Sequence, residues 1–230
     1  MSDAQLATEA QGFAAELTSV IQSAIGPRTS FEAQMVEGGA EAIVGPAPFV
    51  GSRPTFIELN RSCDDEPVLF LRANFNVGLD GESQFLQVLS STLGLFVDVR
   101  QGNKPPKPLV RVEYERKLAE PEEAAAHVHL HANSPELAWV YGSCGNAAKD
   151  LHSLHFPVGG SRFRPTLEEF LLFLDREDIF NDWTEGWHDV VLESLGQWRS
   201  RQAAATVRRF PEEAMKALER LGFQVIPPRG

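Results

Sequence analysis

The sequence predicts an α+β domain, in which a curved antiparallel sheet is packed by an N-terminal helix and a C-terminal helical segment. Two observations carry this prediction. Apolar residues recur with helical period near the N-terminus and again after residue 160, whereas alternation with period two dominates between them. No segment has the composition of a linker between two domains, so residues 1–230 are expected to form one domain. Within it, residues 1–160 supply a helix and the sheet, and residues 161–230 supply the helical part.

The first part of the chain is expected to form one helix followed by strands. Residues 3–25 place apolar side chains near helical spacing, and Gly26–Pro27 ends that helix. Strands are predicted within residues 30–38, 54–60 and 67–78, where β-branched and aromatic residues alternate with polar ones. In the last of these strands, the side chains expected to share the polar face are Arg72, Asn74 and Asn76.

The segment GESQFLQVLSSTLG, residues 81–94, changes period. Its apolar residues follow the spacing i, i+1, i+3, i+4, i+7, i+8, which predicts a helix that ends at Gly94. A hairpin of two strands is the alternative. Strands are predicted for LFVDVR (95–100) and for VRVEYER (110–116), where the valines and Tyr114 are expected to face the core.

The last third of the chain predicts three helices. RPTLEEFLLFLDRED (164–178) has Thr166 as N-cap with Glu169 three residues later, the pattern of a capping box. Residues 186–209 predict a second helix, broken near Gly196, and residues 211–222 predict a third with proline at its first position. FQVIPP (223–228) is expected to be a short strand or an extended tail.

Charge limits the partners that this chain can bind. The net charge is −11, which disfavours attachment to double-stranded DNA or to an anionic membrane. Residues 199–230 differ from the rest, with seven Lys and Arg against three Asp and Glu. The N-terminus lacks the basic and apolar regions of a signal peptide, and no apolar run has the length of a membrane span. These features predict a cytoplasmic protein.

Five of the six histidines fall between residues 126 and 160. HVHLH predicts a strand on which His127, His129 and His131 share one face, at successive spacings of about 6.5–7 Å. The nearest predicted strand is VRVEYER, and an antiparallel pair is the expected arrangement. Such a pair would place Arg111, Glu113 and Glu115 on the face that carries the histidines.

Three interpretations of this face remain open. Histidine and carboxylate can act as general acid and base while arginine offsets charge on a phosphate, as metal-independent RNA cleavage requires; Arg72, Arg111, Arg162 and Arg164 are the candidate arginines. The same histidines can instead bind a divalent metal such as zinc, with His127, His129 and His152 as ligands and His155 nearby. The third interpretation is an exposed polar face without chemistry.

The stretch FPVGGSRFRPT predicts a separate anion site. Gly160, Arg162 and Arg164 precede the helix that begins near Thr166, and backbone N–H groups at a helix start bind anions. A plain loop with a capped helix is the alternative.

VRVEYER, AHVHLHA, LHFPVGG and RFRPTLEEFLLFL together resemble the TumE-like toxin components of toxin–antitoxin pairs, over roughly residues 109–174. Proteins of that family are small and α+β, with a tyrosine-containing strand and a histidine cluster before a final helix. The resemblance implies a bacterial cytoplasmic protein that acts on RNA or on a protein partner.

The sequence therefore predicts a toxin-like, metal-independent ribonuclease with His127, His129, His131, Glu113, Glu115 and Arg111 at its site. The alternatives are a non-catalytic protein-binding subunit, antitoxin-like or accessory, and a metal-dependent hydrolase that uses the same histidines.

Overall fold

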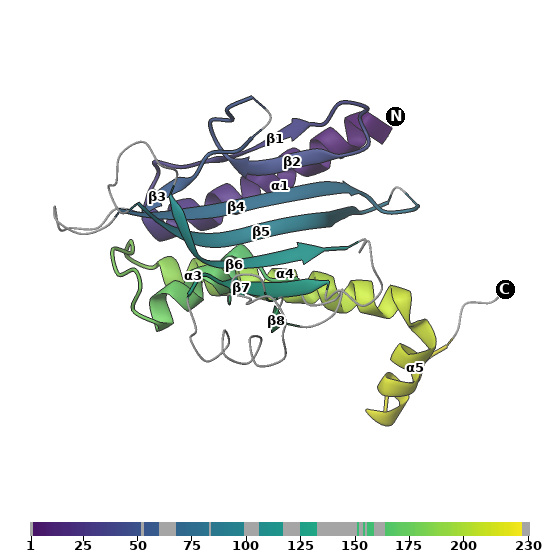
Figure 1. The fold of residues 1–230 in the computed structure, drawn as a ribbon. Coiled ribbons are helices and arrows are strands. Elements are labelled where there is room, and N and C mark those ends of the chain that lie inside the picture. The colour runs from purple at the N-terminus through teal and green to yellow at the C-terminus, as the bar shows by residue number, and fades with distance from the viewer. Residues whose placement is uncertain are drawn as a thin grey trace, which may run out of the picture.

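The computed structural model describes residues 2–51, 53–59, 68–82, 84–98, 106–116, 125–132, 151, 154, 156–158 and 164–226. Its strands form one sheet in the order β1-β2-β4-β5-β6-β7-β8, and β3 pairs with β4 off this path (Figure 1). All of these pairings are antiparallel, which confirms the predicted α+β class. The strands are β1 (Phe31–Met35), β2 (Ala42–Pro46), β3 (Ile57–Leu59), β4 (Val68–Leu79), β5 (Leu86–Asp98), β6 (Lys107–Glu115), β7 (Ala126–Leu130) and β8 (Phe156–Pro157).

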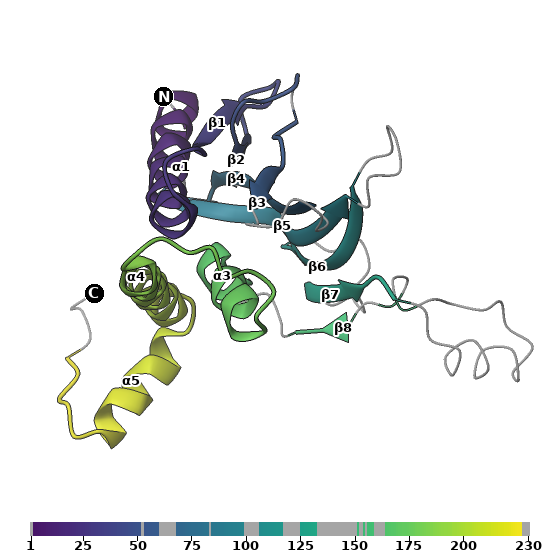
Figure 2. The ribbon, with the colours of Figure 1, turned by 90° about the vertical axis from the view of Figure 1, so that its left-hand side faces the viewer.

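The helices other than α5 lie on one face of the sheet, as Figure 2 shows. They are α1 (Ser2–Ile25), α3 (Leu167–Arg176), α4 (Trp187–Arg209) and α5 (Pro211–Arg220). α1 contacts β1, β2, β4 and β5, and α3 and α4 pack on each other beside it. α5 packs on α4, and none of its residues is buried. The predicted N-terminal helix and C-terminal helical segment are therefore both present.

One hydrophobic core joins α1, the sheet, α3 and α4. Small residues such as Ala10, Ala14 and Ala24 let α1 approach the sheet closely, and all three are nearly inaccessible to solvent. The ring of Phe13 meets Phe75 of β4 edge to face, with the ring centroids 5.3 Å apart. Burial of such apolar surface is the main term that stabilises a fold of this kind.

The helix predicted for residues 81–94 is wrong, because these residues belong largely to strand β5. The reason is a bulge. Asn76 pairs with Ser90 but Val77 pairs with Val88, so Leu89 is an extra residue in β5. A bulge of this kind shifts the alternation by one residue. The core-facing side chains therefore change from Leu86 and Val88 to Ser91 and Leu93, a spacing of three that imitates a helix.

One further expectation needs correction. The helix predicted to break near Gly196 is one continuous helix, α4. A glycine costs a helix only about 1 kcal/mol, and the buried face formed by Trp187, Val191 and Leu195 holds the segment together. Strands β2 and β8 were not predicted, because β2 (AIVGP) is apolar throughout and lacks the alternation with polar residues, and β8 has only two residues. Residues 223–226 form neither helix nor strand, and residues 227–230 lie outside the described part.

Candidate functional site

Four of the predicted site residues meet on neighbouring strands. The register of β6 and β7 pairs Arg111 with His129 and Glu113 with His127. Val112 and Val128, which lie between them, also pair with each other and point to the helix-covered side. Because successive side chains of a strand point to opposite faces, the four polar residues lie on the face turned away from the helices. The predicted antiparallel pair is confirmed.

The Glu113 carboxylate is the centre of this group. Its Oε1 atom lies 3.0 Å from an Arg111 nitrogen, and its Oε2 atom lies 3.3 Å from His129 Nε2 and 3.6 Å from His127 Nε2. The two imidazole rings meet edge to face, with centroids 5.0 Å apart. The exposed fraction of the side chains falls from 32% at Arg111 to 7% at His129. The histidines therefore form the floor of the group and the arginine its rim. We call Arg111, Glu113, His127 and His129 the His/Glu/Arg cluster.

Positive charge extends from this cluster across the sheet. Arg72 of β4 pairs with Gly94 of β5, which pairs with Arg111, so Arg72, Gly94, Arg111 and His129 form one row. The Asn74 side-chain oxygen accepts hydrogen bonds from Arg72 at 3.0 and 3.2 Å, in the amide orientation that satisfies both of its groups. Desolvation and then the positive charge of Arg111 lower the pKa of Arg72. Such a row suits an anionic substrate.

Gly94 leaves room for the arginine in this row. A Cβ atom at this position would lie 2.9 Å from the Phe96 ring and 3.1 Å from both Arg111 Cγ and the Val110 carbonyl oxygen. The bare backbone of Gly94 therefore lets the Arg111 side chain and the Phe96 ring lie against the sheet. The sequence assigned Gly94 to a helix end, and no local signal identified this role, which depends on neighbouring strands.

The cluster also has the donor set of a metal site. One ligand atom each from Glu113, His127 and His129 lie within 4.8 Å of one another. Two imidazole nitrogens and a carboxylate oxygen are a set that zinc and other divalent first-row metals accept. The structure thus supports a group that can bind metal. His152, the third predicted ligand, and His155 lie outside the described residues.

The remaining predicted site residues lie apart from the cluster's centre. Glu115 is exposed, and its backbone nitrogen donates to the Ala125 oxygen at 2.8 Å. His131 follows β7, and its backbone nitrogen donates to the Leu109 oxygen at 2.9 Å. Leu109 is four residues from Glu113, or roughly 13 Å along the strand. Catalytic roles for Glu115 and His131 remain predictions.

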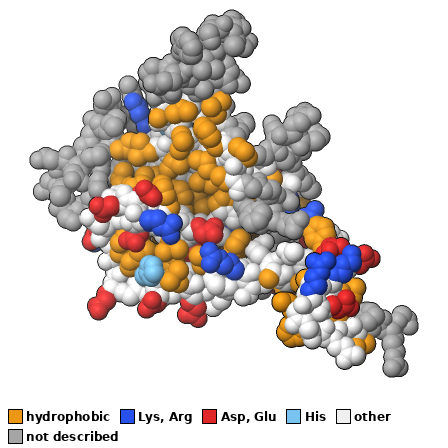
Figure 3. Space-filling view, turned by 90° about the horizontal axis from the view of Figure 1, so that it is seen from below, with side chains coloured by type: hydrophobic (Ala, Val, Ile, Leu, Met, Phe, Trp, Pro, Cys, Tyr) orange, Lys and Arg blue, Asp and Glu red, His pale blue; other side chains and the backbone are white. Residues whose placement is uncertain are grey.

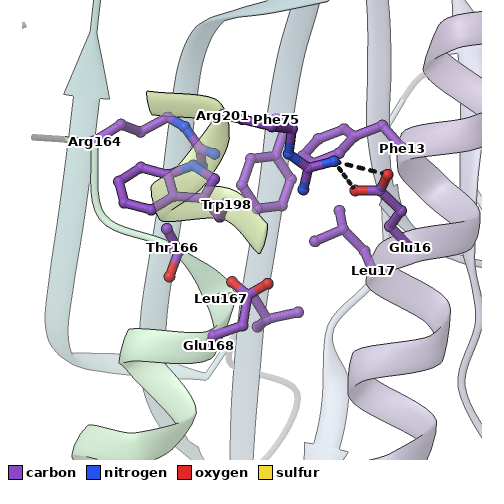
Figure 4. A pocket seen from close by; sticks show the side chains of 10 residues that line it. All are labelled: Phe13, Glu16, Leu17, Phe75, Arg164, Thr166, Leu167, Glu168, Trp198 and Arg201. Carbon is purple, nitrogen blue, oxygen red and sulfur yellow. Dashed lines mark hydrogen bonds and ion pairs between the residues drawn. The ribbon is translucent and has the colours of Figure 1, made fainter. Parts of the chain in front are cut away.

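The predicted anion site is described only at Arg164, because Gly160 and Arg162 lie outside the described residues. Thr166 is the N-cap of α3, as predicted, and its hydroxyl accepts from the Glu169 nitrogen at 3.1 Å. Arg164 lies on the helix side of the sheet, where its side chain extends over the Trp198 indole (Figure 4). Arg164 therefore lies on the opposite side of the sheet from the His/Glu/Arg cluster, whereas Arg72 and Arg111 lie on its face.

No family model, curated protein or solved structure matches the chain. The likeness to TumE-like toxins thus remains a prediction. Among the described helices, none combines the length and the apolar character needed to cross a membrane.

Proposed function

We propose that the His/Glu/Arg cluster is the catalytic centre of a metal-independent, RNA-cleaving enzyme of toxin type. The observation that carries this proposal is the approach of two imidazole Nε2 atoms to one carboxylate oxygen, at 3.3 and 3.6 Å, beside an arginine. Histidine is the side chain whose ordinary pKa lets it take and give protons near neutral pH. Two histidines held together can therefore serve as base and acid in one reaction.

The proposed reaction is a transesterification within RNA. One imidazole removes the proton of a 2′-hydroxyl, whose oxygen then forms a bond to the neighbouring phosphorus. The bond from phosphorus to the 5′-oxygen breaks, and the second histidine, protonated at the start, gives its proton to that oxygen. The products are a 2′,3′-cyclic phosphate and a free 5′-hydroxyl. Glu113 orients the rings, while Arg111 and Arg72 offset the charge that develops on the phosphate.

Cleavage of matched oligonucleotides tests this proposal. Single-stranded RNA is compared with the same strand carrying one 2′-deoxy nucleotide at the cleaved position, with EDTA present. We expect His127→Ala and His129→Ala each to lower the rate by about 10²–10⁴-fold, the usual contribution of a general acid or base. His188→Ala is the matched control, because His188 is exposed on α4. Equal cleavage by the wild type and both cluster variants, or of both substrates, would exclude this mechanism.

A metal-dependent hydrolase is the second candidate, favoured by the convergence of the Glu113, His127 and His129 ligand atoms. In this case the three residues would hold a divalent ion such as zinc, which activates water for attack on an ester. Elemental analysis of the untagged protein separates the two candidates. Near-stoichiometric metal that is lost in the double variant His127→Ala/His129→Ala, together with activity abolished by EDTA, supports the second. Activity without metal supports the first.

A further inference from the structure

A groove opens on the helix side of the sheet, behind the His/Glu/Arg cluster. Its volume is ≈ 750 Å³, within the range of about 300–1,000 Å³ usual for small-molecule sites. β6 and β7 form one wall, and α4 forms the other. Most of the lining is apolar, and the residues that the argument uses are Val112, Val128, Val158, Arg164, Trp198 and Ala203. Seen from below, the molecule carries a broad area of hydrophobic side chains (Figure 3).

Arg164 brings a positive charge into this apolar groove. Its guanidinium lies 5.6 Å from the centroid of the Phe75 ring and 5.9 Å from that of Trp198. Among the described residues, its hydrogen bond runs from NH1 to the adjacent Pro165 oxygen at 3.2 Å, and no carboxylate oxygen lies within 4.0 Å of its nitrogens. Removal from water lowers the pKa of Arg164 to about 10. The charge is therefore partly removed from water, and no described residue forms an ion pair with it.

The carboxylates nearest to this charge already have other donors. Glu168 accepts a hydrogen bond from the Ser194 hydroxyl at 2.6 Å. Glu169 lies 3.8 Å from Arg199 at the exposed rim of the groove. In the small pocket behind Arg164, the Glu16 carboxylate is bound by Arg201 at 2.9 Å (Figure 4). Each of these three carboxylates is therefore bound by a donor other than Arg164.

Trp198 adds a second donor without an acceptor. Its indole Nε1 atom is buried and has no hydrogen-bond partner within the described part of the chain. Buried donors are nearly always paired, and each exception calls for an explanation. Arg164 and Trp198 both line the groove, so the side of the groove that carries Arg164 presents hydrogen-bond donors from the side chains of both residues.

We propose that this groove binds an amphiphilic monocarboxylate, with its carboxylate on Arg164 and its aliphatic chain along Val112, Val128, Val158 and Ala203. The planar fork of a guanidinium matches a carboxylate through two parallel hydrogen bonds. The valines and alanine offer no polar partner, so the body of the ligand is aliphatic. This proposal does not rest on the proposed ribonuclease, because the groove lies on the opposite face of β6 and β7.

Calorimetric titration of the full chain with decanoate tests the proposal, with 1-decanol and acetate as the two reference ligands. We expect saturable 1:1 binding of decanoate, at least tenfold tighter than that of either reference. Arg164→Met should weaken decanoate binding at least tenfold and leave decanol unchanged. Ala203→Trp, at an exposed position of α4, should fill the groove and abolish binding of both decyl ligands. Arg199→Met is the matched control and should stay within threefold of wild type.

Thermal unfolding of each variant shows whether it is folded before its affinity is interpreted. If Arg164→Met does not fold, Arg164→Lys takes its place, because it keeps the charge and loses the planar fork. Absence of saturable decanoate binding to the wild type overturns the proposal. Equal losses in the Arg164 and Arg199 variants, or acetate binding as tightly as decanoate, also overturn it. None of these measurements depends on turnover, so failure of the ribonuclease proposal leaves them unaffected.

Discussion

A single added methyl group at Gly94 tests the packing of Arg111 against the sheet. The new Cβ atom would meet the Phe96 ring at 2.9 Å, and Arg111 Cγ and the Val110 oxygen at 3.1 Å. The Val110 oxygen belongs to the backbone of β6, which pairs with β5 at this point, so it cannot move without disturbing that pairing. The Arg111 side chain can move, but only away from its place beside Glu113. Gly94→Ala should therefore lower both stability and cluster function.

The size of the stability effect follows from two opposing terms. Overpacking in a closely packed region costs about 1–3 kcal/mol. Replacing glycine with alanine also restricts the unfolded chain, which returns about 0.4–1 kcal/mol. The free energy of unfolding of Gly94→Ala should thus fall by roughly 0.5–2 kcal/mol. Urea unfolding monitored by tryptophan fluorescence measures this change, with an unchanged slope showing that only stability has altered.

Gly12→Ala is the matched control for this experiment. Gly12 lies within α1, and no atom lies within 4 Å of the position that its Cβ would take. The same chemical change should therefore stabilise the protein, by about 0.5–1 kcal/mol, because alanine is the better helix former. Opposite signs for the two variants support the packing argument. A Gly94→Ala protein as stable as Gly12→Ala would refute it.

Five further variants test the core, a helix cap and the groove. Leu171→Ala, at a side chain with 0% exposure, should lower the free energy of unfolding by about 2–5 kcal/mol, whereas Leu192→Ala, at a 44% exposed position, should change it by no more than ~0.5 kcal/mol. Thr166→Ala should lower the free energy of unfolding by about 1 kcal/mol, because the N-cap of α3 is lost. Thr166→Ser should keep most of the stabilisation from the cap, because serine also has a hydroxyl that can accept the hydrogen bond. Arg164→Met should raise the free energy of unfolding of the ligand-free protein by roughly 1 kcal/mol, measured from its urea midpoint, because it removes a partly desolvated charge that has no ion-pair partner among the described residues.

The spacing of apolar residues along the sequence predicted most of the helices and strands, but it failed at the bulge in β5. Strict alternation in β4, β6 and β7 identified these strands correctly, because each keeps one face toward the core. In β5, the extra residue Leu89 shifts the alternation, so local spacing resembled a helix. The pairing that reveals the bulge involves Asn76 and Val77, at least a dozen residues away. A pattern within one segment cannot contain that information.

Only part of the candidate site could be predicted, because the rest depends on contacts between segments that are distant in the sequence. Histidines at alternate positions and the neighbouring glutamate strand were enough to predict that Glu113, His127 and His129 meet. The contribution of Gly94 could not be predicted, because it depends on side chains that cross from two other strands. Arg164 looked like an anion-binding residue at a helix start, and only the packing of α4 shows that it faces an apolar groove.

The pairing register of β6 and β7 limits how far these two strands can shift relative to each other. Val112 and Val128 face the groove, and the cluster faces the other way. A slip of one residue exchanges the two faces of a strand, so it would turn the charged side chains toward the core and the valines toward solvent. Burying charged side chains in the core would be costly, and this cost favours the register in which Glu113 pairs with His127. Substitutions that weaken the packing of Val112 and Val128 should therefore increase the range of positions of the His127 and His129 side chains at a lower denaturant concentration than global unfolding requires.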